Sequence, residues 1–177
     1  TLPRDIADAH LSGSLHISSL SSWILKPSEI MHDLRFFFQN ILNLAKMNAL
    51  QPSFLPPKNL ESALSMTFNV LLHSADEIVG TQTLEYFNIS LAPFVRGMAS
   101  AEIKEALRLF IFNLNQHVNA SLSMEPTIPD FIAEKPAFGP SGNLVGKYGD
   151  FKEESRLLAS LLLEIFTEMS TLKPLFN

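Results

Sequence analysis

Residues 150–166 read DFKEESRLLASLLLEIF, the clearest structural pattern in the chain. Asp150, with Glu153 three residues later, has the spacing of a capping box, in which two side chains satisfy free N–H groups at the start of a helix. Apolar residues then recur at spacings of three and four, which places them on one side of a helix. They are Leu157, Leu158, Leu161, Leu162, Ile165 and Phe166. The pattern predicts a helix with one buried side and favours a mainly α fold.

Further helices are predicted from the same apolar spacing. They cover residues 3–11, 28–48, 59–80, 84–95 and 100–114. Pro27 suits the first turn of the second segment, and Asn59 and Ser100 suit the cap positions of two others. Pro93 lies inside the segment 84–95, where its ring removes a backbone hydrogen bond, so we expect a kink or a split there.

Three stretches depart from the helical pattern. Residues 14–20 and 120–124 alternate imperfectly between apolar and polar, as short strands do. Residues 124–150 hold four prolines and four glycines, which favours an irregular surface connection, with residues 143–148 as the arm of a small hairpin. We therefore predict a mainly α fold of five to six helices with one or two short strands and a Pro/Gly-rich loop. No repeat or low-complexity linker divides the sequence, so residues 1–177 are expected to form a single domain.

Charge and hydropathy exclude two classes of partner. The net charge is −5, and the 13 Lys and Arg residues are scattered, whereas nucleic-acid-binding proteins concentrate basic residues on one surface. No apolar run approaches the roughly 20 residues that a membrane-spanning helix needs. We expect a soluble, cytoplasmic protein that binds neither nucleic acid nor membranes. Because the sequence begins with Thr1 inside an amphipathic segment, we also expect it to be a piece of a longer protein.

Residues able to carry chemistry are few. The chain has no cysteine, and His10 and His16 lack the companions that zinc sites require at close spacing, so neither a metal nor a cofactor is predicted. His32 and Asp33 are adjacent and would point about 100° apart on a helix, so they do not form an acid–base pair; we expect Asp33 to be solvated or paired with a nearby base. The glycines of residues 138–151, with Lys147, suit a phosphate cradle, but Asp150 would repel the anion, which favours turns before a capped helix.

Seven strings occur in an order that is specific as a set. They cover residues 2–17, 32–35, 85–88, 91–97, 112–116, 125–131 and 146–151. Together they resemble the catalytic subunit of anaerobic (class III) ribonucleoside-triphosphate reductases of the archaeal type. The resemblance implies the first part of a glycyl-radical barrel, in which helices surround strands. The full enzyme reduces nucleotides at the 2′ carbon through a thiyl radical, which is generated from a backbone glycyl radical.

The chain departs from this family at the positions that matter for chemistry. The family's His-Ile-His-Asp string is His-Ile-Ser-Ser at residues 16–19, and its Gly-Gly-Gln string is Gly-Thr-Gln at residues 80–82. A family cysteine would fall near Ser28 or Glu29. The segment between Gln116 and Glu125 is shortened, and the family's later half, with its further cysteine and radical glycine, would lie beyond Asn177. Because only sulfur can hold a thiyl radical, the chain alone is expected not to reduce ribonucleotides, and no catalytic residue is predicted.

Two hypotheses follow. The first is a degenerate relative of the reductase that acts as a binding or interaction module. The alternative is a segment or subunit of a functional reductase whose cysteines and glycyl radical lie in another chain.

If a substrate site persists, we predict it at His16, Ser18, His32 and Asn115, where inherited polar positions would converge. Loss of the rest of a barrel would expose apolar faces, so a homodimer is expected to bury part of the stripes at residues 36–44 or 157–166. A reductase-type partner chain is the other expected partner.

Overall fold

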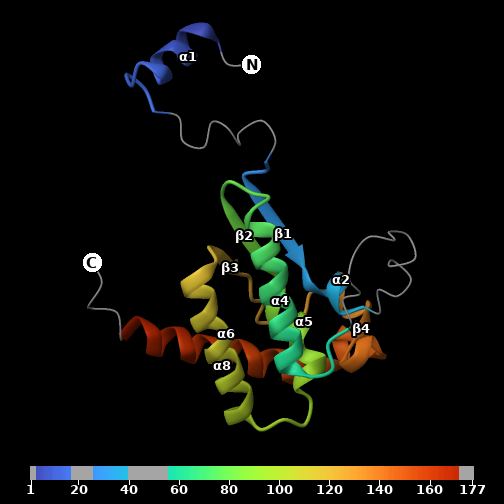
Figure 1. Cartoon of the computed structure of the whole chain (residues 1–177). Helices are drawn as coiled ribbons and strands as arrows, with labels where there is room; N and C mark the ends of the chain where they lie inside the picture. The colour runs from blue at the N-terminus through green and yellow to red at the C-terminus, as the bar shows by residue number, and fades with distance from the viewer. Residues whose placement is uncertain (1–2, 17–25, 40–55, 172–177) are drawn as a thin grey trace.

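The computed structural model of the chain describes residues 3–16, 26–39 and 56–171. Seven α-helices and five short strands lie in these segments (Figure 1), which confirms the mainly α class. The helices are α1 (Arg4–Leu11), α2 (Leu34–Phe38), α4 (Leu60–Ala75), α5 (Phe87–Val95), α6 (Ser100–His117), α7 (Asp130–Ala133) and α8 (Lys152–Thr171). The strands are β1 (Glu29–Asp33), β2 (Thr81–Glu85), β3 (Ala120–Leu122), β4 (Pro136–Phe138) and β5 (Leu144–Lys147). Two 3₁₀ turns, η1 (Pro140–Gly142) and η2 (Tyr148–Phe151), complete the set.

Strands β1, β2 and β3 form a parallel sheet in that order. Their residues alternate between two faces, and the face that holds His32, Gln82 and Leu84 is buried. Helix α4 packs against this buried face, because the Gln82 side chain donates a hydrogen bond to the Leu71 carbonyl of α4 (Nε2–O 2.9 Å). The opposite face is largely exposed, with Met31 61% accessible. A parallel sheet is usually covered on both faces, so this open face is an unusual feature.

Helix α5 forms the centre of the hydrophobic core. All nine of its residues are buried, and α4, α6 and α8 surround it (Figure 1). Helix α8 supplies four buried side chains to the same core: Leu158, Leu161, Leu162 and Ile165. Full burial of a leucine or isoleucine contributes about 1.5–3 kcal/mol relative to exposure, so the stripe predicted from the sequence anchors α8. Pro93 lies inside α5 without splitting it, and the helix begins at Phe87 because residues 81–85 form β2 and Tyr86 forms the left-handed turn between the two elements.

The predicted helix over residues 28–48 is wrong at its start. Residues 29–33 form β1, and only residues 34–38 form a helix, α2; residues 40–48 lie outside the described part of the chain. The five β1 residues pair in register with β2, from Glu29 opposite Thr81 to Asp33 opposite Glu85. Strand pairing with β2, a strand that the sequence did not predict, therefore replaces the helix.

The other strand predictions have mixed outcomes. Residues 120–122 form β3, as expected within 120–124. Residues 14–16 form no strand, and residues 17–20 lie outside the described ranges. The expected hairpin arm at 143–148 is confirmed as β5, which pairs antiparallel with β4.

The start of helix α8 differs from the capping box that the sequence predicted for Asp150 and Glu153. The η2 turn leads directly into α8 at Lys152, and the Asp150 carboxylate accepts a hydrogen bond from the Lys147 backbone (N–Oδ2 2.9 Å). The Arg96 guanidinium lies over the Phe151 ring at 4.0 Å and donates to the Asp150 carbonyl (Nη2–O 2.6 Å). The start of α8 is thus fixed by α5 and the hairpin. Within the described ranges, no helix has the length and hydropathy that crossing a bilayer requires.

Candidate functional site

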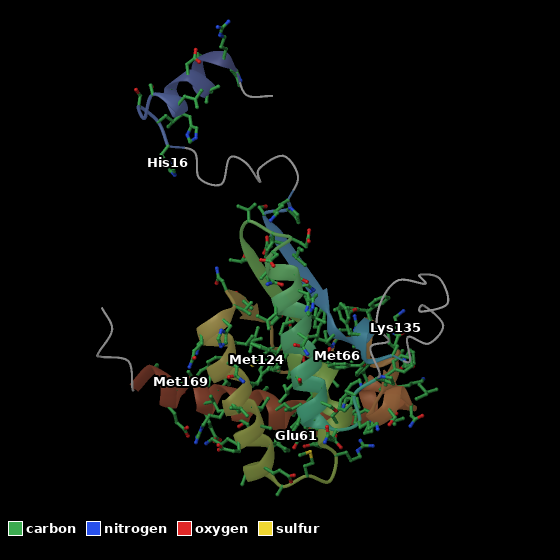
Figure 2. All side chains as sticks on the ribbon, in the orientation of Figure 1. His16, Glu61, Met66, Met124, Lys135 and Met169 are labelled. Carbon is green, nitrogen blue, oxygen red and sulfur yellow. The ribbon has the colours of Figure 1, made fainter. Side chains whose placement is uncertain are left out.

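Of the four residues predicted to line a substrate site, the structure describes three, and these lie on separate elements. His32 is buried on β1, and exposed Asn115, near the end of α6, lines a shallow polar hollow with residues 116–120. Exposed His16 follows α1, outside the body formed by the other elements (Figure 2). Ser18 lies outside the described residues. Convergence of these four positions remains a prediction.

His32 has a structural partner. Its Nε2 lies 2.8 Å from Oε1 of Gln82, and the Gln82 amide nitrogen donates to Leu71. Because the amide nitrogen faces Leu71, the amide oxygen faces His32, and the His32 Nε2–H is therefore the donor. This arrangement satisfies a buried polar pair between β1 and β2 and holds the imidazole in one tautomer.

The carboxyl edge of the parallel sheet carries a cluster of charged and aromatic side chains. In open parallel sheets ligands bind at this edge. Asp33 ends β1 and Glu85 ends β2, opposite each other in the register. The Arg35 guanidinium forms a two-pronged pair with Asp33 (Nε–Oδ1 2.8 Å, Nη2–Oδ2 2.7 Å). Asp33 also accepts from the Arg35 backbone (N–Oδ1 3.0 Å), so the expectation of a paired Asp33 is confirmed.

Tyr86 adopts an uncommon backbone conformation beside this pair. Its φ of 50° lies in the left-handed region, which few non-glycine residues occupy and which recurs at functional sites. The Arg35 guanidinium lies 5.7 Å from the Tyr86 ring centroid, and the Phe131 ring meets it edge-on at 6.0 Å. The hydrogen bond that Arg35 donates to Asp33 raises the pKa of Arg35, and burial opposes this effect in part. The guanidinium therefore stays charged at all relevant pH values.

A pocket of about 260 Å³ opens next to the Asp33–Arg35 pair. Its polar lining also includes Gln39 and Lys135. The rest of the wall consists of Pro136 and three aromatic side chains: Phe36, Phe138 and Tyr148. Figure 2 shows Lys135 in the region of α2 and β4, so the hairpin and the end of β1 meet here.

Tyr148 is almost fully buried in this pocket's wall. Its hydroxyl has no hydrogen-bond partner of good geometry among the described residues. Burial raises the pKa of the Tyr148 hydroxyl, and the positive charge of Arg35 opposes this effect only in part. The hydroxyl is therefore a neutral donor at physiological pH.

The glycine-rich segment before α8 does not form a phosphate cradle. Lys147 forms an ion pair with Glu134 (Nζ–Oε2 2.5 Å), and its backbone N–H is used by Asp150. Turns before a helix, the interpretation that the sequence favoured, describe this segment, which also contains the β4–β5 hairpin. No three His, Asp or Glu side chains gather in a metal-binding arrangement within residues 3–16, 26–39 and 56–171.

The pocket residues were not predicted as a site. Arg35 and Tyr148 each belong to a string that carried the family resemblance, which was the one available signal. Lys135 and Tyr148 belong to the Pro/Gly-rich segment, about 100 residues away from Arg35, and only the tertiary fold brings these segments together.

Comparison with known proteins agrees with the sequence strings. The family model described as anaerobic ribonucleoside-triphosphate reductase matches residues 1–175. No curated protein matches the chain. Among solved structures, the anaerobic ribonucleotide reductase from Thermotoga maritima with citrate in the active site is similar, with a TM-score of 0.67 and 14% identity. The match covers 93% of this chain and 31% of that one.

Two further structures of the Thermotoga maritima enzyme show the same similarity. The form with dATP in the specificity site has a TM-score of 0.66, 13% identity and coverage of 93% and 30%. The complex with dATP and CTP has a TM-score of 0.64, 14% identity and coverage of 93% and 29%. These similarities show a shared fold, and the chain spans about a third of the length of that enzyme. Since the family model covers nearly every residue, the chain belongs to the anaerobic ribonucleoside-triphosphate reductase family.

Proposed function

We propose that the chain is a degenerate member of this family that does not reduce nucleotides by itself and acts as a binding or interaction module. The observation that carries the proposal is the position of Glu29. It is the first residue of β1 and shares the open sheet face with Met31 and Asp33. The resemblance places a cysteine at or beside this position. A carboxylate cannot carry a thiyl radical, and none of the 177 residues is a cysteine.

A second candidate function is supported by the open face of the sheet. One face of β1–β3 is exposed, whereas parallel sheets are usually covered on both sides. A reductase-type partner chain that covers this face would supply the cysteines and the glycyl radical. The chain would then be one segment of a working reductase, consistent with its coverage of about a third of the Thermotoga maritima enzyme.

An anaerobic reconstitution distinguishes the two candidates. The purified chain is incubated with ribonucleoside triphosphates and a reductant, alone and with the products of neighbouring genes, and deoxynucleotide formation is measured. No product is expected in either case. Product from the chain alone would contradict the proposal. Copurification with a chain that shows a glycyl-radical spectrum, together with turnover by the pair, would establish the second candidate instead.

A residual nucleotide site at His16, Ser18, His32 and Asn115 belongs to the same proposal. The Thermotoga maritima structures contain dATP and CTP, and exposed His16 and Asn115 are available to a ligand. Calorimetric titration with a ribonucleoside triphosphate is expected to give saturable heat with a dissociation constant near 1 mM or below, equivalent to about −4.1 kcal/mol. Absence of heat at that concentration would remove the nucleotide from the proposal.

We also propose a cytoplasmic homodimer. Most of the stripe at residues 157–166 packs within the chain, which leaves Leu163 and Phe166 exposed on α8. Phe36, in the other predicted stripe, is 50% exposed. Sedimentation equilibrium is expected to show a dimer, and a Phe36→Ser variant is expected to dissociate more readily. A monomer throughout a concentration series would contradict this part of the proposal.

A further inference from the structure

We infer that the pocket at the carboxyl end of β1 binds a small organic anion, in which a phosphate or carboxylate group is attached to an apolar or planar body. The pocket lies between the Asp33–Arg35 pair and the β4–β5 hairpin. This inference is independent of any reductase activity.

The charge balance of the pocket favours an anion. Three charged side chains line it: Asp33, Arg35 and Lys135. The Asp33 carboxylate is occupied by Arg35, through three hydrogen bonds of 2.7–3.0 Å. Within the described residues, no ion pair is formed by Lys135, so its positive charge remains uncompensated. Glu85, opposite Asp33 in the sheet, is outside the lining of the pocket.

Donors are also in excess over acceptors. The Arg35 side chain has five N–H groups, and its Nη1 takes no part in the pair with Asp33. Lys135 adds an ammonium group, and Gln39 an amide. The buried Tyr148 hydroxyl has no hydrogen-bond partner of good geometry among the described residues, and a buried unsatisfied donor is costly. A phosphate or carboxylate supplies the acceptor oxygens that such a set of donors lacks, and a guanidinium matches these groups in geometry.

The walls and the size of the pocket specify the rest of the ligand. Phe36, half exposed, and Pro136 form apolar wall next to the donors. Such surface favours an apolar or flat group over a fully hydrated ion. A volume of about 260 Å³ is slightly smaller than most sites for drug-sized molecules, which fits a small molecule or one end of a larger one.

Nuclear magnetic resonance titrations with phenyl phosphate and with benzoate test the inference. Saturable shifts are expected at the amides of Arg35 and Lys135, with a dissociation constant below about 1 mM for at least one probe. The probe that binds with the lower dissociation constant shows whether the pocket prefers a phosphate or a carboxylate group. Inorganic phosphate is expected to bind more weakly than phenyl phosphate, because it does not use the Phe36 wall.

Two variants and a matched control locate the site. Lys135→Gln, at an exposed position, is expected to weaken binding about tenfold, the loss typical of one charge-assisted hydrogen bond. Tyr148→Phe removes a hydroxyl that forms no hydrogen bond of good geometry with the described residues, so it is expected to weaken binding severalfold without lowering the melting temperature. Lys152→Gln, at an exposed lysine outside the pocket, is expected to leave binding unchanged. Shifts that do not saturate, or equal losses in the Lys135 and Lys152 variants, would overturn the inference, because either result would indicate general charge attraction.

Discussion

His32 on β1 donates a hydrogen bond to Gln82 on β2, with 2.8 Å between Nε2 and Oε1, and both side chains are buried. The pair fixes which faces of the two strands lie inward. Gln82 also donates to α4 through the Leu71 carbonyl, so one amide joins both strands and the helix that covers them.

Gln82→Leu is expected to destabilise the fold by about 1–3 kcal/mol, because it keeps the volume roughly constant but leaves the buried His32 donor unsatisfied. Urea unfolding measures the difference in the free energy of unfolding. Gln116→Leu, at an exposed position on α6, serves as the control and is expected to change stability by less than about 0.5 kcal/mol. Equal effects of the two substitutions would show that the buried pair adds nothing to stability.

Gly80→Ala is expected to lower the free energy of unfolding by roughly 2 kcal/mol or more. An added Cβ would lie 2.0 Å from the Ser28 carbonyl oxygen, so the backbone of β1 or β2 would have to shift. Thermal unfolding followed by circular dichroism measures the loss of stability. Glu77→Ala, at an exposed position nearby, is the control; a Gly80 variant as stable as this control would contradict the close approach of the two segments.

Asn88→Ala is expected to destabilise the protein by about 2–4 kcal/mol. The fully buried Asn88 side chain donates to Glu125 and Ser155 and accepts from the Glu125 backbone, which ties α5 to α8 and to the segment after β3. Denaturant titration measures this change in the free energy of unfolding. Asn69→Ala, exposed on α4, should remain within about 0.5 kcal/mol of the unsubstituted chain, and a similarly small effect at Asn88 would refute the prediction.

Glu154 should contribute a pH-dependent part of stability. Burial raises the pKa of the Glu154 carboxyl, but the hydrogen bond and charge of Arg96, together with a backbone hydrogen bond, lower it more, so the net pKa lies below its ordinary value of 4.5. A depressed carboxyl pKa stabilises the folded state above the unfolded pKa, and this contribution is lost as the pH falls through the folded value. Because Arg96 is half exposed, the contribution is at most about 1 kcal/mol.

Melting temperatures of the unsubstituted chain and of Glu154→Gln, recorded from pH 7 to pH 3, check this expectation. The variant should be less stable at pH 7, and the difference should shrink below pH 4.5. A difference that is constant across the series would mean that the ion pair with Arg96 does not provide it.

The sequence predicted the long helices because their apolar residues follow the helical period without interruption. Helices α4, α6 and α8 bury such stripes. The sheet was largely missed for a physical reason: its buried face includes His32 and Gln82, which do not count as apolar in a periodic pattern. Ile30, Leu34 and Phe38 also match helical spacing, although a strand ends and a short helix begins between them.

Local sequence patterns could not predict the pocket. Arg35 and Lys135 come from segments that meet only after the sheet, α5 and the hairpin have packed. The pairing of Asp33, by contrast, was predictable because its partner lies two residues away. Short-range electrostatics can be read from a sequence, whereas a site assembled from distant segments requires the fold.

Helix α8 supplies four core side chains, and it is made after every other described element. During synthesis, residues 60–117, with their apolar surfaces on α4, α5 and α6, are made before the helix that covers them. Until α8 packs, the apolar surfaces of α4, α5 and α6 are only partly covered, a state that favours chaperone binding. Packing of α8 is therefore the step that covers the core side chains of α5 and α6.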